Sequence, residues 1–139
     1  MRVLLVCHKP AFPVVDGGAF DGAGLARALA ASGAEVEVLA MASGGRRYDG
    51  PPEVAQEVVR VDSSVRVLGS LRALWRGEAD VVARYRSLVF AQRLEERLRS
   101  VAYDIVQFDG CATGQYLELA RSVAASRVIL RAHNDEADL

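Results

Sequence analysis

Short apolar runs alternate along the chain with stretches in which apolar residues recur at helical spacing. Residues 3–7 form a continuous apolar run, which is typical of a strand covered on both faces. A helical pattern follows, and Asp16 is suited to capping its start while Gly33 is suited to ending it. Residues 34–41 alternate between apolar and acidic positions, as a second strand does. This part of the chain therefore predicts a βαβ unit with two parallel strands.

The middle of the chain divides less clearly into elements. Residues 42–53 are rich in glycine and proline, which indicates a surface loop. Two valine-rich runs, at residues 58–61 and 65–68, predict a third strand and leave the place of a fourth open. From residue 71 to residue 99 the spacing is helical, and Gly77 is expected to divide this stretch into two helices.

The second of these helices is expected to carry two apolar stripes, with its arginines on the solvated side. The stripes consist of Val82, Tyr85 and Val89, continued on a neighbouring face by Phe90, Leu94 and Leu98. Three further elements follow it. Residues 103–108 predict a buried strand, residues 113–121 a short helix, and residues 127–131 a last strand.

This order of elements predicts an α/β fold, an open and mostly parallel Rossmann-like sheet with helices on both faces. Ligands of such sheets bind outside the carboxyl ends of the strands, where the strand order reverses. For strand order 3-2-1-4-5 that point lies between the first strand and the strand that ends at Phe108. We expect three loops to meet there, at residues 8–18, 109–113 and 132–136.

Composition narrows the class of protein. A chain of 139 residues with 51% hydrophobic residues can bury one core, so we expect a single domain over residues 1–139. The net charge of −1 gives no sign of a nucleic-acid partner. No signal sequence or membrane span is visible, which predicts a cytoplasmic protein. Cys7 and Cys111 are expected to be small buried hydrophobes, and two histidines without a third nitrogen ligand do not predict a metal site.

Glycines stand next to the start of the first predicted helix. Asp16, Gly17 and Gly18 precede it, so backbone N–H groups there could hold a phosphate. The same residues also fit an ordinary tight turn between strand and helix. Their spacing is neither a dinucleotide fingerprint nor a P-loop.

Polar residues follow two of the later strands. His133 stands beside Asn134 and Glu136, and it could donate to a ligand oxygen or carry a proton, or simply bond to nearby backbone. Asp109, with Gly110 after it, could face a hydroxylated ligand or cap the next helix.

Taken in order, these segments resemble the N-terminal domain of glycosyltransferase family 4, whose enzymes have the two-domain GT-B fold. The resemblance spans nearly the whole chain. It rests on residues 1–6, 10–13, 16–18, 29–36, 82–87, 103–106 and 131–136.

The resemblance implies retaining transfer of a sugar from a nucleotide-sugar, used as co-substrate, to an acceptor hydroxyl, with no metal or other cofactor. It implies that Gly17 and Gly18 approach the pyrophosphate and that His133 contacts the transferred sugar as the catalytic residue. Asp16, Asp109, Asn134 and Glu136 are further candidates for binding substrate.

The sequence departs from the family pattern in two ways. Phe20 and Asp21 stand where the family often carries a basic residue, and the chain ends at Leu139, before the second, nucleotide-binding domain. We therefore expect a bacterial acceptor-side domain that needs a C-terminal domain of the same protein and is inactive alone. Peripheral contact with the inner membrane stays open. The alternative is a free-standing α/β module that binds a small anion or nucleotide.

Overall fold

Five parallel strands form one open sheet in the computed structural model, which describes residues 1–44, 49–62, 82, 83, 85–124 and 126–132. The strands are β1 (Arg2–Cys7), β2 (Glu35–Ala42), β3 (Val54–Arg60), β4 (Ile105–Asp109) and β5 (Arg127–Arg131). Their order is β3-β2-β1-β4-β5, and every neighbouring pair is parallel. The predicted sheet, with its reversal between β1 and β4, is confirmed.

Strand β1 lies at the centre because its residues are apolar on both sides. Val3 to Val6 are each at most 1% exposed. Leu4 and Val6 face one cluster of buried side chains, while Val3 and Leu5 face the other. Such a strand is stable only when both faces of the sheet are covered.

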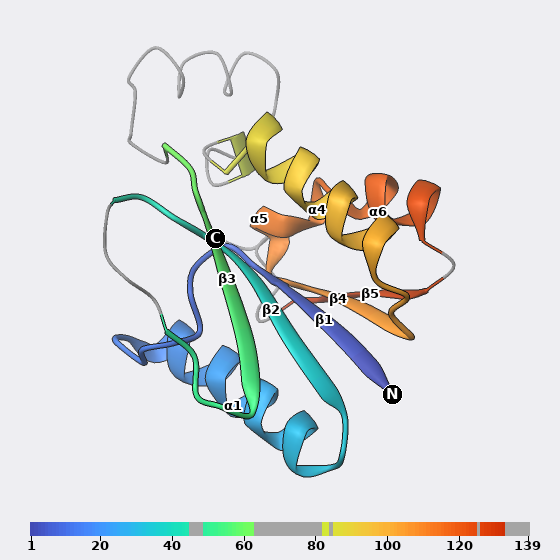
Figure 1. Cartoon of the computed structure of the whole chain (residues 1–139). Coiled ribbons are helices and arrows are strands. Elements are labelled where there is room, and N and C mark those ends of the chain that lie inside the picture. The colour runs from blue at the N-terminus through green and yellow to red at the C-terminus, as the bar shows by residue number, and fades with distance from the viewer. Residues whose placement is uncertain (45–48, 63–81, 84, 125, 133–139) are drawn as a thin grey trace.

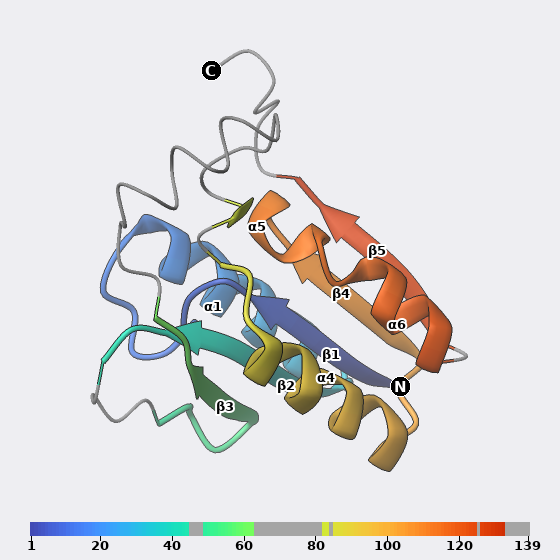
Figure 2. The same ribbon diagram turned by 90° about the horizontal axis from the view of Figure 1, so that it is seen from above.

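Helices cover both faces, as the sequence predicts. Helix α1 (Gly17–Ala31) packs on one face, against the side chains of β1 and β2. Helices α4 (Leu88–Ser100) and α6 (Leu117–Val123) lie side by side on the other face (Figures 1 and 2). The switch point between β1 and β4 therefore lies between two helical layers.

Both predicted ends of α1 are confirmed. Asp16 has extended backbone, and its Oδ1 accepts from the Ala19 N–H at 2.8 Å, which is an N-cap bond. At the other end Gly33 has φ of 89°, and its N–H donates to the Ala30 carbonyl at 2.9 Å. Glycine adopts this left-handed backbone readily, so the helix ends there.

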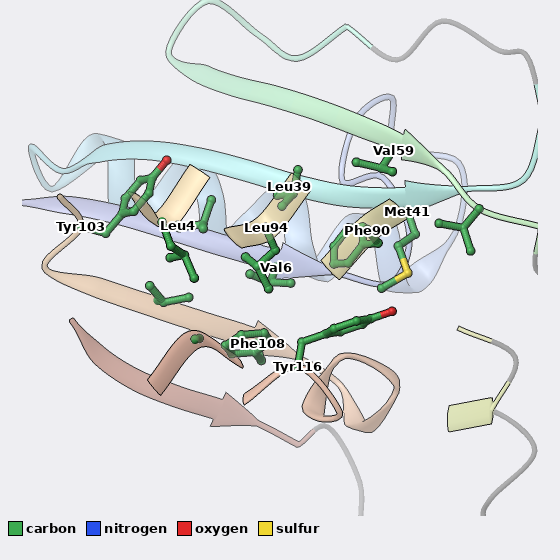
Figure 3. Close-up of a cluster of buried hydrophobic side chains, with 14 residues drawn as sticks. Leu4, Val6, Leu39, Met41, Val59, Phe90, Leu94, Tyr103, Phe108 and Tyr116 are labelled. Carbon is green, nitrogen blue, oxygen red and sulfur yellow. The ribbon is translucent and has the colours of Figure 1, made fainter. Parts of the chain in front are cut away.

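Helix α4 begins later than the sequence predicts. Ser87 is its N-cap, and Ser87 Oγ accepts from the Phe90 N–H at 3.2 Å. The stripe of Phe90, Leu94 and Leu98 is buried as expected and forms the centre of the larger core cluster (Figure 3). The predicted stripe of Val82, Tyr85 and Val89 does not form on this helix, because Tyr85 precedes its N-cap and Val89 is 61% exposed.

Acidic side chains of the sheet hold α4 in place as well. Glu57 of β3 pairs with Arg93, and Glu37 of β2 pairs with Arg97 at 3.1 Å and accepts from the Tyr103 hydroxyl at 2.7 Å. These arginines belong to a helix face that sequence reasoning assigns to solvent. They are instead only partly exposed, because they pair with Glu57 and Glu37 of the sheet. The sequence pattern does not show this, since these partners lie in distant strands.

The segment after β4 forms two short helices where the sequence predicts one. They are α5 (Cys111–Gly114) and α6, separated by Gln115 and Tyr116. The predicted strand at 65–68 and the helix around Gly77 lie outside the described residues. No helix among the described residues is long and apolar enough to cross a membrane.

Candidate functional site at the carboxyl edge of the sheet

The loops after β1 and β4 meet at the predicted switch point. His8 follows β1, and Gly110 follows β4. A Cβ placed on Gly110 would lie 3.6 Å from His8 Nδ1, so the two loops are in direct contact. The Gly110 N–H donates to the Arg131 carbonyl at 2.9 Å, which adds the end of β5 to the same place. Two of the three predicted loops thus converge, together with the last residue of β5.

Beside this point a pocket of about 150 Å³ opens at the carboxyl ends of β1, β2 and β3. Its walls combine polar side chains with apolar ones. They are His8, Lys9, Pro10, Met41, Ala42, Ser43, Val61 and Tyr85. A cavity of about this volume can hold one six-membered ring, since engineered cavities of roughly 150 Å³ bind benzene. Its mixed lining suits a ring with both hydroxyl groups and C–H faces.

The ring of Tyr85 forms part of the pocket wall and meets His8 edge-on. The two ring centroids are 5.4 Å apart at an interplanar angle of 75°. An edge-to-face contact of this kind fixes the relative orientation of two rings. His8 therefore contacts Tyr85 and lies next to Gly110.

A side chain of β3 holds the loop after β1. Gln56 Oε1 accepts from the N–H groups of Ala11 and Phe12, both at 3.0 Å, and Gln56 Nε2 donates to the Phe12 carbonyl at 2.8 Å. Arg27 of α1 lies over the Phe12 ring, 5.2 Å from its centroid. The loop that carries Lys9 and Pro10 into the pocket is thus fixed by two other elements.

The start of α1 is occupied by the side chains of the chain itself. Lys9 Nζ donates to Asp16 Oδ1 at 2.9 Å, and the same oxygen accepts the capping bond from Ala19. A Cβ on Gly18 would lie 2.4 Å from both Lys9 Cε and Nζ, so Gly18 leaves room for Lys9 to cross the helix end. The hydrogen bond from Lys9, together with the capping bond, lowers the pKa of Asp16.

Asp109 lies in an ionic chain that links three elements. Its side chain is 9% exposed, and its Oδ1 lies 3.4 Å from Arg131 Nη1. Arg131 Nη2 in turn lies 2.8 Å from Asp21 Oδ2 of α1. Asp21 and Asp109 raise the pKa of Arg131, so its charge is fixed. Asp21 thus recruits a cation from β5 at the position where the sequence departs from the family pattern.

Cys7 is buried beneath this edge, whereas Cys111 is only half-buried. Burial, with a smaller contribution from Asp109, raises the pKa of the Cys7 thiol. Cys7 is therefore a neutral core side chain, as predicted. Within the part of the chain that the structure describes, no group of three or more His, Cys, Asp and Glu side chains is arranged to hold a metal ion.

The predicted site residues fall into three groups. Asp16, Gly17 and Gly18 lie at the start of α1, and Asp109 lies at the end of β4, all at the expected edge. Gly17 has no other atom near the place of a Cβ, so among these glycines only Gly18 is spatially restricted. His133, Asn134 and Glu136 lie outside the described residues, and their roles stay predictions.

Sequence reasoning missed the residues that hold the site together, namely Gln56, Tyr85, Arg131 and Gln115 with Tyr116. Arg131 had a signal, because it ends the last predicted strand at the predicted edge. Gln56 had none, since its partners are backbone groups 44 and 45 residues away.

Comparison with protein-family models matches residues 17–139 to a glycosyl transferase 4-like domain. The match begins at the first residue of α1. It therefore includes the pocket residues at and after the ends of β2 and β3, Tyr85, and the Asp109–Arg131 pair. No curated protein matches the sequence.

Proposed function

This chain belongs to glycosyltransferase family 4 as a glycosyl transferase 4-like domain, and we propose that it forms the acceptor side of a retaining enzyme. The reaction proposed is transfer of a sugar from a nucleotide-sugar to an acceptor hydroxyl. The observation that carries the proposal is the pocket of about 150 Å³ at the carboxyl edge of this family's domain. It is large enough for one ring of an acceptor, and the polar side chains of its lining are His8, Lys9, Ser43 and Tyr85.

The charges at this edge favour a neutral acceptor ring over a phosphate. Lys9 is paired with Asp16, and Arg131 is paired with both Asp21 and Asp109. A diphosphate at either cation would have to compete with a carboxylate already in place. We therefore propose that the nucleotide and its phosphates are held mainly by a second domain, and that Gly18 serves the packing of Lys9.

The roles of the C-terminal residues of the chain form part of the same proposal. His133 would contact the transferred sugar, and Asn134 and Glu136 would bind substrate beside it. Their place after β5 supports this, because Arg131, the last residue of β5, already lies at the switch point.

Ring binding tests the proposal directly. Saturation-transfer difference NMR on the purified chain, with glucose and myo-inositol as neutral probes, should detect weak binding. A ring of about 12 heavy atoms at roughly −0.3 kcal/mol per atom gives a Kd of a few millimolar. Ser43→Phe, an exposed position on the pocket wall, should abolish the signal.

Ala102→Phe is the matched control, since Ala102 is exposed at the opposite edge of the sheet, beside Tyr103. It should leave ring binding unchanged. If neither ring binds, or if Ser43→Phe binds as the wild type does, the pocket is not the acceptor site. Tighter binding of free UDP or GDP than of any neutral ring would favour the free-standing nucleotide module instead.

A further inference from the structure

The hydroxyl group of Tyr116 bonds to the chain on both sides of Arg86. Tyr116 Oη donates to the Tyr85 carbonyl at 2.7 Å and accepts from the Ser87 N–H at 2.9 Å. Ser87 is the residue that caps α4. One side chain between α5 and α6 therefore fixes the main chain where it leaves the pocket wall and enters a helix.

The preceding residue acts on the same segment. Gln115 Nε2 donates to the Val82 carbonyl at 3.0 Å and to the Ala112 carbonyl at 2.8 Å. Gln115 and Tyr116 thus engage backbone groups of Val82, Tyr85 and Ser87, about 30 residues earlier in the sequence. Both residues lie at the break between α5 and α6.

Burial keeps the Tyr116 hydroxyl in the form that the contact needs. Tyr116 is 5% exposed, and desolvation raises the pKa of its hydroxyl. A neutral phenol can donate one hydrogen bond and accept another, whereas a phenolate can only accept. The two bonds to Tyr85 and Ser87 therefore persist together across the neutral pH range.

We propose that Tyr116 and Gln115 are positioning residues of the pocket. They hold the main chain of Tyr85 so that its ring forms the wall beside His8, and substrate meets them only through Tyr85. Their effect on substrate selection rests on the proposed function, because it requires the pocket to be the acceptor site. Their effect on the geometry of His8 and Tyr85 does not.

Paired tyrosine variants separate positioning from packing. Tyr116→Phe keeps the ring, whose centroid lies 5.2 Å from that of Phe90, and removes only the hydroxyl group. Tyr103→Phe is its control, because Tyr103 is equally buried and its hydroxyl also has a partner, Glu37. Figure 3 shows the two tyrosines well apart in the same core cluster, so both variants should lose stability while only one alters the pocket.

The readouts are the ring proton resonances of His8 and the hydrogen exchange of the Ser87 amide. In Tyr116→Phe the His8 resonances should shift, and the Ser87 amide should exchange roughly five- to tenfold faster, the factor for one lost hydrogen bond. Gln115→Met should shift the His8 resonances in the same direction, and it replaces Tyr116→Phe if that variant does not fold. Tyr103→Phe should change neither readout.

Unchanged His8 resonances in both Tyr116→Phe and Gln115→Met would overturn the proposal. So would an equal shift in Tyr103→Phe, because it would mean that any loss of a core hydroxyl disturbs the pocket. Myo-inositol binding distinguishes the two proposals. If His8 responds but no ring binds, the positioning role stands and the acceptor site fails. If the ring binds equally to wild type and Tyr116→Phe, the effect of Tyr116 on substrate selection fails.

Discussion

Replacing Gly110 by alanine should destabilise the protein through its backbone alone. Gly110 has φ of 82° and ψ of 159°, a combination that is essentially restricted to glycine and costs other residues about 1–3 kcal/mol. Space is not the limit, because a Cβ there would make an ordinary 3.6 Å contact with His8. If the backbone rotated to relieve the strain, the N–H bond from Gly110 to the Arg131 carbonyl would be lost, so a cost remains either way.

The expected shift in melting temperature follows from chain length. At about 2.1 cal/mol/K per residue, 139 residues give an unfolding entropy of about 290 cal/mol/K. Each kcal/mol of lost unfolding free energy then lowers Tm by about 3.4 °C, so Gly110→Ala should melt about 3–10 °C below wild type. Circular dichroism melts and urea titrations measure this.

Gly114→Ala is the control for this substitution. Gly114 is the last residue of α5, its φ is negative, and a Cβ there would lie 3.7 Å from Leu130. Alanine should therefore be neutral or stabilising by up to about 1 kcal/mol. If Gly110→Ala melts within about 1 °C of wild type while Gly114→Ala behaves as expected, the strain argument is wrong.

Three further predictions concern the loop after β1 and the start of α1. Gly18→Ala should displace Lys9 and bring the pKa of Asp16 back toward its ordinary value, whereas Gly17→Ala should leave that pKa lowered. NMR titration measures both, and equal pKa values in the two variants would contradict the role given to Gly18. Gln56→Ala leaves the buried N–H groups of Ala11 and Phe12 without their acceptor, so the free energy of unfolding measured in urea should fall by about 1–3 kcal/mol. Gln92→Ala, on the exposed side of α4, should leave that free energy almost unchanged. The folded pKa of Asp16 lies below its ordinary value of 3.8, so the contribution of Asp16 to stability is complete above that value and is lost as pH falls through the folded pKa. Asp16→Asn should therefore reduce the slope of the unfolding free energy against pH only below about pH 4. An unchanged slope there would count against the Lys9 contact.

The sequence predicted those features that depend on local patterns. The apolar run of β1, the capping residue Asp16 and the ending residue Gly33 each act on neighbours a few positions away, and all three are confirmed. Strand order followed because the βαβ pattern and the buried strands leave few arrangements.

The contacts that form the site could not be predicted in this way. The spacing of Tyr85 from Val82 and Val89 predicts a helix. In the structure Ser87 caps α4 only after it, and Tyr116 bonds to its carbonyl from 31 residues away. For Arg131 the pattern indicates only a place in the last strand, whereas its partner Asp21 lies 110 positions earlier. A sequence pattern gives the residue type at each such position but not the pairs that these residues form.

The long separation of these pairs has a consequence for synthesis and folding. Asp21 is made early, but its partner Arg131 emerges from the ribosome 110 residues later, and Gln56 reaches the loop after β1 only once β3 is paired. Contacts of such high contact order form late, since the chain must close long loops before it gains them. The core helix α1 and its neighbouring strands can therefore fold first, while the binding edge is completed last. A chain folded only over β1, α1 and β2 would lack both the site and the larger core cluster, because that cluster needs β4 paired to β1. Ligand binding at this edge therefore reports completed folding rather than helping to start it.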